Sequence, residues 1–225
     1  MEAFRVFADA EAAAQAAADF LAAQLIACIN EKQVCHVALP GGTTPARCLQ
    51  LLSARELPWN KIHWYLGDER CAPLGHEQRN DSMIAQQLWS RIQAPPENIH
   101  PIAAELGAEL AAEKYAELLN RVGMLDIVVL GMGEDGHTAS LFPGNAAIED
   151  RRAAVPVFEA PKPPAERVSL GLETIRAAVQ RIIIVTGTGK REALAQVKRG
   201  VQLPVSRIGP SYWFVDKAAA DSDNI

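Results

Sequence analysis

The stretch Leu125-Asp126-Ile127-Val128-Val129-Leu130-Gly131-Met132-Gly133-Glu134-Asp135-Gly136-His137-Thr138 decides the fold that we expect for this chain. Residues 126–130 form a nearly continuous apolar run, which is typical of a strand that is buried on both faces. Glycines follow the run and provide a turn, and an acid and a histidine lie within that turn. The sequence therefore predicts a buried strand that delivers Asp135 and His137 to a site.

Similar apolar strands alternate with helical segments along the rest of the chain. Strands are expected at residues 4–7, 34–39, 62–66, 126–130, 154–157, 168–170, 181–186 and 212–215. Helices are expected at about residues 9–30, 45–53, 81–92, 106–121, 173–179 and 190–199. This alternation indicates an α/β fold with a mostly parallel, open, Rossmann-like sheet and helices on both faces. We expect one domain that spans residues 1–225.

Composition and charge narrow the possible partners. The chain has 225 residues and a net charge of −5, which argues against a nucleic-acid partner but permits an anionic small molecule. Residues 1–11 lack the apolar core of a secretory signal. The alanine-rich segment 12–28 is interrupted by Asp19 and Gln24, so we expect a packed helix and no membrane span.

The four cysteines form no C-x-x-C pair, and no histidine cluster has zinc spacing. We therefore expect reduced thiols, a cytoplasmic protein and no bound metal.

Polar, glycine-rich segments follow four of the predicted strands. In open parallel sheets, ligands bind beyond the carboxyl ends of the strands, so we expect these segments to meet at one edge. They are Gly41–Thr44, Asp68–Arg70, Gly133–His137 and Gly187–Lys190.

Two of these segments have the features of anion-binding loops. Gly41, Gly42 and Thr43 offer backbone N–H groups and a hydroxyl before a helix start, which suits a phosphate. The simpler alternative is a tight turn with Thr44 as the N-cap. The segment at 187–190 repeats the design with Lys190, but it lacks the residues of a complete nucleotide-binding P-loop. For Lys190 the alternative is a solvated side chain.

The run 131–136 matches the dinucleotide pattern G-x-G-x-x-G, but its chemistry does not suit that role. Glu134 and Asp135 would repel a pyrophosphate, and the run lies in the middle of the chain. His137 has a better use as a general base on water, with a carboxylate to orient its ring. Asp135 and Asp68 are both candidates for that carboxylate, and a structural histidine is the alternative.

Asp68-Glu69-Arg70 places a guanidinium at a strand end, where Arg70 can bind an anion in a bidentate manner. The alternative is an internal ion pair. The chain has no G-x-S-x-G nucleophile elbow. The residues favour attack by activated water, or proton transfer on a sugar, over covalent or metal catalysis.

These blocks resemble the 6-phosphogluconolactonase family. The matching segments are 39–45, 67–70, 130–144, 167–170, 187–190 and 213–216, in the family's order. Glucosamine-6-phosphate deaminases, which belong to the same superfamily, carry Asp-Glu-Tyr in place of Asp68-Glu69-Arg70 and Asn-Glu-Pro in place of residues 141–143. The chain departs from the lactonase pattern at Arg79-Asn80, where Ser-Asn is common, and at Ala72-Pro73, where Val-Pro is common.

The resemblance implies hydrolysis of 6-phospho-D-glucono-1,5-lactone to 6-phosphogluconate, without a cofactor or metal, by a monomer or small homo-oligomer. It implies that His137 acts as the base and that Arg70 stabilises anionic charge. The phosphate would lie against Gly42, Thr43, Lys190 and Arg167. Two alternatives stay open: an amino-sugar phosphate isomerase or deaminase, and a sugar-phosphate sensor without catalysis.

Overall fold

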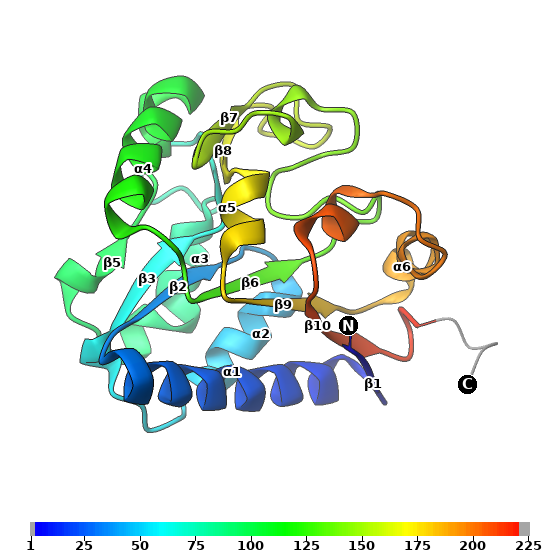
Figure 1. The fold of residues 1–225 in the computed structure, drawn as a ribbon, viewed down its shortest axis with the longest axis horizontal. Coiled ribbons are helices and arrows are strands. Elements are labelled where there is room, and N and C mark those ends of the chain that lie inside the picture. Colours follow the sequence, from blue (N-terminus) through cyan, green and yellow to red (C-terminus); the bar gives the residue numbers. More distant parts are fainter. Residues whose placement is uncertain (1–2, 221–225) are drawn as a thin grey trace.

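The predicted central strand is β6 (Ile127–Gly131), and it lies in the middle of a seven-stranded sheet in the computed structural model, which describes residues 3–220. The strand order is β1-β10-β9-β6-β2-β3-β5, and every pairing is parallel (Figure 1). The other six strands are β1 (Ala3–Phe7), β2 (Cys35–Leu39), β3 (Ile62–Leu66), β5 (Ile99–His100), β9 (Gln180–Val185) and β10 (Tyr212–Asp216). The mostly parallel α/β fold is therefore confirmed.

The helices cover the sheet from two sides. They are α1 (Ala10–Lys32), α2 (Thr43–Leu52), α3 (Asn80–Gln87), α4 (Ala108–Val122), α5 (Leu172–Ala177) and α6 (Arg191–Lys198). α1 and α2 pack against each other below the sheet in Figure 1, and α4 and α5 lie above it. Asp9 caps α1 as its sequence position suggests, because its side chain accepts a hydrogen bond from the N–H of Ala12 at 2.8 Å.

Helix α1 is long and apolar enough, by length and composition alone, to cross a membrane. In the structure it runs along the sheet and packs against α2, with five alanines and three larger aliphatic side chains buried on its inner side. Small side chains permit this close approach, so α1 packs one side against the rest of the fold.

A second, smaller sheet differs from the sequence prediction. Residues 68–70 were expected to be a loop, but they form the short strand β4 (Asp68–Arg70), which pairs antiparallel with β8 (Arg167–Leu170). The strand β7 (Ala154–Val157) completes this sheet in the order β4-β8-β7. The pairing places Arg70 directly opposite Arg167 and so brings together two cations that are far apart in the chain.

Two helix boundaries also differ from the prediction. α2 begins at Thr43 with Gly42 as its N-cap, two residues before the expected start at Pro45, so the alternative in which Thr44 is the N-cap is wrong. α3 ends at Gln87, and a short 3-10 helix takes up residues 89–91 in place of the longer helix that we expected.

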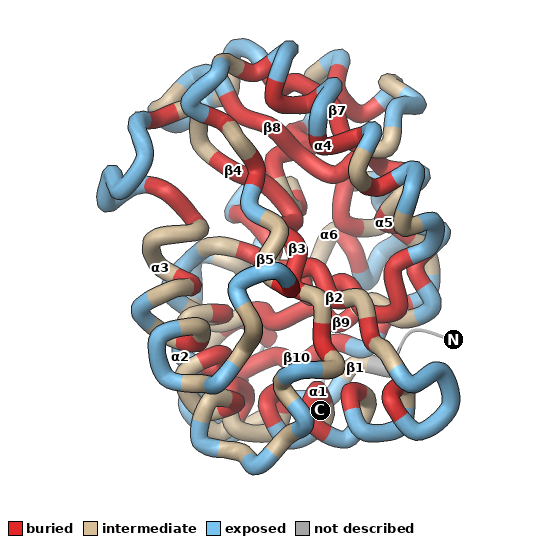
Figure 2. Tube along the Cα trace, turned by 90° about the vertical axis from the view of Figure 1, so that its left-hand side faces the viewer, coloured by how far each residue is buried: buried red, intermediate tan, exposed pale blue. Residues whose placement is uncertain are grey.

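The core is continuous from the main sheet to the helices. Figure 2 shows buried residues concentrated in the strands and exposed residues in the outer loops. Two charged side chains of the β4–α3 region, Glu69 and Arg79, are also buried, with 0% of each side chain exposed. Burial of unpaired charges is costly, so these two side chains require partners.

Candidate active site

The four polar segments converge on one cavity of about 450 Å³ at the carboxyl ends of the parallel strands. Its walls include residues from every segment that we expected to meet there, together with residues from the segment before β8, from the start of β8 and from the end of β9. The charged side chains on the wall are one carboxylate, Asp68, and four cations, Arg70, Lys162, Arg167 and Lys190. The cavity is therefore suited to an anionic ligand, and its volume suits a small molecule.

His137 lies on this wall, and Asp135 holds its ring. The distance from His137 Nδ1 to Asp135 Oδ1 is 2.5 Å, and the backbone N–H of His137 donates to the same oxygen at 3.1 Å. Burial acts to raise the pKa of Asp135, but the hydrogen bonds from His137 outweigh it and lower the pKa to about 2. Asp135 is therefore ionised at neutral pH and stabilises a charge on the ring.

The pair depends on a glycine at position 133. A Cβ at Gly133 would lie 2.0 Å from His137 Nδ1 and 2.7 Å from Asp135 Oδ1. Gly133, one of the glycines that resemble a dinucleotide pattern, therefore makes room here for the histidine and its acid.

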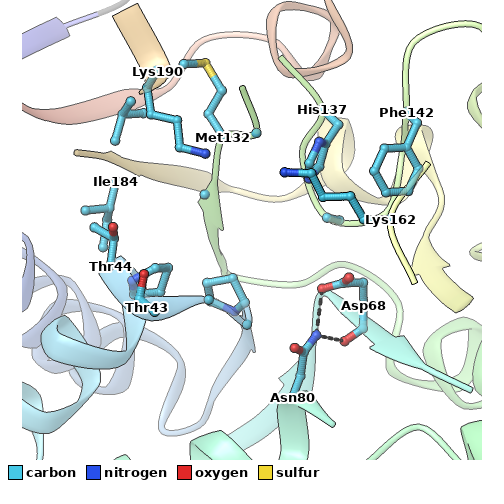
Figure 3. A pocket seen from close by; sticks show the side chains of 18 of the residues that line it. Thr43, Thr44, Asp68, Asn80, Met132, His137, Phe142, Lys162, Ile184 and Lys190 are labelled. Atoms are coloured by element: carbon cyan, nitrogen blue, oxygen red, sulfur yellow. Dashed lines mark hydrogen bonds between the residues drawn. The ribbon is translucent and has the colours of Figure 1, made fainter. Parts of the chain in front are cut away.

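Asp68, the rival partner for His137, is occupied elsewhere. Ser140 Oγ donates to Asp68 Oδ2 at 2.6 Å, and Asn80 Nδ2 donates to Asp68 Oδ1 at 3.0 Å and to its main-chain oxygen at 2.8 Å. Figure 3 shows Asp68 and Asn80 together, across the cavity from Lys190. Of the two acids, the geometry assigns Asp135 to the histidine and leaves Asp68 on the cavity wall.

The loop at 41–44 lies at the start of α2 and on the cavity wall. Gly42 has a φ of 97°, a backbone conformation that favours glycine. The hydroxyl groups of Thr44 and Thr186 are 2.6 Å apart, which joins this loop to the end of β9. Thr43 follows Gly42 at the first position of the helix, where the backbone N–H groups of a helix favour an anion.

In the loop at 187–190, one of the backbone donors that could bind an anion already has a partner within the protein. The carboxylate of Asp216, at the end of β10, accepts the N–H of Gly187 at 3.0 and 3.1 Å, so this donor is already used. Lys190 does reach the cavity, and Figure 3 shows its amine pointing inward. Burial lowers the pKa of Lys190, and Glu134 opposes the shift. The Lys190 cation and the backbone N–H groups of Thr188 and Gly189 are what this loop can offer a ligand.

Arg70 and Arg167 stand side by side on the small sheet. Arg70 NH1 donates to the main-chain oxygen of Gln78 at 2.6 Å, while its buried Nε has no hydrogen-bond partner within residues 3–220. Arg70 forms no ion pair with an acid among these residues, contrary to the alternative weighed from the sequence. Arg167 donates to main-chain oxygens of the 162–164 turn and packs over Phe142. Desolvation lowers the pKa of Arg167, so a nearby anion would stabilise the charge of its guanidinium.

Sequence reasoning missed four residues of the site. Lys162 extends into the cavity from the proline-rich segment, near Glu134 at 3.4 Å, and nothing in that segment marked it as functional. Phe142 packs against the His137 ring at a centroid distance of 4.5 Å. Asn80 and Ser140 hold Asp68, and both lie inside or beside the blocks that carry the family resemblance.

Arg79, the departure from the lactonase pattern, lies behind the cavity wall and not on it. Its guanidinium donates to the main-chain oxygens of Ala72 and Ile102 at 3.0 Å each, and to the carboxylates of Asp81 and Glu105. Arg79 thus supports the segment that carries Asn80, and its own side chain does not line the cavity.

Comparisons with known proteins agree with this geometry. Residues 8–214 match the family model described as glucosamine-6-phosphate isomerases/6-phosphogluconolactonase. The chain is 31% identical to the 6-phosphogluconolactonase of Haemophilus influenzae, over 92% of this chain and 95% of that protein. It is 32% identical to the human 6-phosphogluconolactonase, over 96% and 91% of the two chains.

A solved structure gives the same result. The crystal structure of 6-phosphogluconolactonase from Thermotoga maritima superposes with a TM-score of 0.91 and 27% identity, covering 96% of this chain and all of that one. The chain belongs to the glucosamine-6-phosphate isomerase/6-phosphogluconolactonase family.

Proposed function

We propose that this protein hydrolyses 6-phospho-D-glucono-1,5-lactone to 6-phosphogluconate, the step of the oxidative pentose phosphate pathway for which its relatives are named. The observation that carries the proposal is the His137–Asp135 pair on the wall of a cavity that also presents four cations. A base and an anion-binding wall are what hydrolysis of a phosphorylated lactone needs.

His137 acts as the general base. It removes a proton from a water molecule, whose oxygen forms a bond to C1 of the lactone and leaves negative charge on the carbonyl oxygen. The C1–ring oxygen bond then breaks, and the proton on His137 passes to the departing ring oxygen. Asp135 fixes the tautomer of the ring and stabilises the imidazolium between these two transfers. General-base catalysis of this kind supplies roughly 10²- to 10⁴-fold.

Three of the four cations divide between two tasks. Lys190, Thr43 and the backbone beside Gly42 lie together and hold the substrate phosphate. The resemblance placed Arg167 at the phosphate, but Arg167 lies opposite Arg70 on the small sheet. We therefore assign both arginines to anionic charge on the substrate, including the oxygen that becomes negative during attack. Asp68 accepts hydrogen bonds from sugar hydroxyl groups.

The assignment of His137 is tested by a lactonase assay on purified protein. The lactone is generated in place, and the product is measured with 6-phosphogluconate dehydrogenase, fast enough to exceed spontaneous hydrolysis. His137→Ala should lose at least ~10²-fold in kcat with little change in KM. His100→Gln is the control, since His100 is a half-buried histidine on β5, outside the cavity. Near-normal turnover by His137→Ala would overturn the base assignment.

The same preparation should release no ammonia from glucosamine 6-phosphate. Release at a rate comparable to lactone hydrolysis would instead favour the deaminase reading. We also infer a cytoplasmic enzyme that works as a monomer or a small homo-oligomer. All four cysteines are free, which fits a reducing compartment.

A further inference from the structure

Asn80 is a buried amide on the cavity wall that contacts two loops of the site. It is the first residue of α3, and 2% of its surface is exposed. Its Nδ2 donates to the side chain and the main chain of Asp68. Its Oδ1 lies against Gly41, where a Cβ would come within 1.9 Å. We propose that Asn80 is a positioning residue for lactone hydrolysis, which fixes Asp68 and the Gly41 loop relative to each other.

Asp68 is the first of the two groups that the Asn80 side chain contacts. This carboxylate is 6% exposed, and it receives Ser140 on Oδ2 and Asn80 on Oδ1. Two donors from different segments hold its plane in one orientation. A buried carboxylate that loses one of these donors loses both its direction and part of the stabilisation of its charge.

Gly41 is the second group that the Asn80 side chain contacts. Among the three atoms nearest to a Cβ built there, all belong to the Asn80 side chain, at 1.9, 2.4 and 2.9 Å. Gly41 does not have a positive φ, so alanine is compatible with the backbone itself. The glycine is required by the close approach of Asn80, which sets how deep the 41–44 loop lies in the site.

The backbone of Asn80 is held by contacts that do not involve its side-chain amide. The buried carboxylate of Glu69 accepts the backbone N–H groups of Asn80 and Asp81 at 2.7 and 2.9 Å. The neighbouring Arg79 fixes the same turn through carbonyl and carboxylate partners. These contacts involve the backbone of residue 80 and not its amide. Removal of the amide should therefore leave the start of α3 in place.

The experiment compares two buried asparagines. Asn98 is buried like Asn80, with 6% of its surface exposed. Its Nδ2 donates to the main-chain oxygen of Asn60 at 3.0 Å, away from the cavity. Asn80→Ala should lower kcat/KM for the lactone by ~10²-fold, the scale of a misplacement of about 1 Å. Asn98→Ala should lower only the thermal midpoint. Equal kcat/KM in the two variants would overturn the proposal.

Asn80→Asp separates positioning from simple space filling. The variant keeps the shape that packs against Gly41 but replaces the donor with a second carboxylate beside Asp68. Two adjacent carboxylates share a proton more readily as the pH falls. The ratio of variant to wild-type kcat/KM should therefore be low at pH 7.5 and rise towards pH 5.5. A ratio that is near one at both pH values would show that only volume matters.

A double-substitution cycle tests the Gly41 contact. Gly41→Ala should be strongly harmful to kcat/KM in the natural background and much less harmful in an Asn80→Ala background, where the obstructing amide is gone. Equal losses in both backgrounds would overturn this part of the proposal.

The inference rests on the proposed site, and the two can fail separately. If His137→Ala retains activity, the base assignment fails, while the Asn80 and Gly41 coupling is still measured on the intact enzyme. If the wild-type protein hydrolyses no lactone, the proposed function fails before any variant is compared.

Discussion

The lack of a side chain at Gly133 allows His137 and Asp135 to contact each other. The imidazole of His137 and the carboxylate of Asp135 occupy the space where any Cβ at position 133 would lie. The short Nδ1–Oδ1 contact is possible only because the turn carries glycine there. A base whose ring is displaced loses alignment with the water that it must activate.

We therefore expect Gly133→Ala to lower kcat by ~10²-fold or more, since displacement of the ring by about 1 Å has that cost. The control is Gly67→Ala, because a Cβ at Gly67 meets nothing closer than 3.5 Å. Steady-state kinetics of both variants would check this. A Gly133→Ala enzyme as active as Gly67→Ala would contradict the steric argument.

The sequence was a better guide to which side chains carry the chemistry than to which hydrogen-bond partners hold them. His137 and Asp135 could be named from their order after a strand, because a turn keeps near neighbours close. The choice between Asp135 and Asp68 depended on where Asn80 and Ser140 lie, and no local pattern encodes that. Lys162 was missed because its contribution depends on the path of the segment at 158–166.

At the scale of elements, Arg79 joins the start of α3 to the turn at 102–105. All three guanidinium nitrogens have hydrogen-bond partners, and the side chain is fully buried beside Glu69, 3.9 Å away. Burial raises the pKa of Glu69 to about 7. Loss of Arg79 would leave this carboxyl and Asp81 without their cation.

Arg79→Ser, which places the lactonase-type residue here, should cost about 3–5 kcal/mol of unfolding free energy, as expected when one partner of a buried pair is removed. The control is Arg176→Ser on α5, whose partner Glu173 has 59% of its side chain exposed. That exposed pair should contribute no more than ~1 kcal/mol. Urea unfolding of both variants provides the comparison, and similar losses would refute a structural role for Arg79.

The long, apolar elements were predictable, and the small sheet was not. The strands β2, β3, β6 and β9 are mostly apolar runs, and this pattern can be recognised in the sequence without knowledge of the tertiary contacts. β4 has three residues and a charged sequence, and it exists because β8 offers it an antiparallel partner about a hundred residues later. The opposition of Arg70 and Arg167 follows from that pairing alone.

At the scale of the whole molecule, the half of the sheet near β5 carries a row of histidines. The rings of His36 and His63 lie 5.1 Å apart, those of His63 and His100 lie 5.3 Å apart, and His63 Nδ1 is 3.0 Å from His100 Nε2. Burial lowers the pKa of all three, and their mutual proximity adds to the shift for His36 and His100.

The row should make the protein less stable below about pH 6.5, the ordinary pKa of histidine. Because the folded-state pKa values are depressed, the unfolded chain binds more protons in that range, so stability falls as the pH falls. Glu69 acts in the opposite direction, since its raised pKa favours the folded state as the pH falls from 7 to about 4.5.

A comparison with His63→Phe isolates the histidine contribution, because Glu69 is common to both proteins. The loss of unfolding free energy between pH 7.5 and pH 5.5 should be smaller in the variant. Identical losses in urea titrations at the two pH values would count against the row as the cause.

The pairing of β1 with β10 has a consequence for how the chain acquires its structure. The first strand of the chain finds its partner in the last, with Ala3 opposite Tyr212 and Phe7 opposite Asp216, and Phe4 stacks on Trp213. During synthesis, the amino-terminal strand leaves the ribosome long before its partner exists. Closure of this edge must then wait until residues 212–216 have been synthesised, and until then Phe4, Phe7 and the buried side of α1 lack these packing partners and are accessible to chaperones.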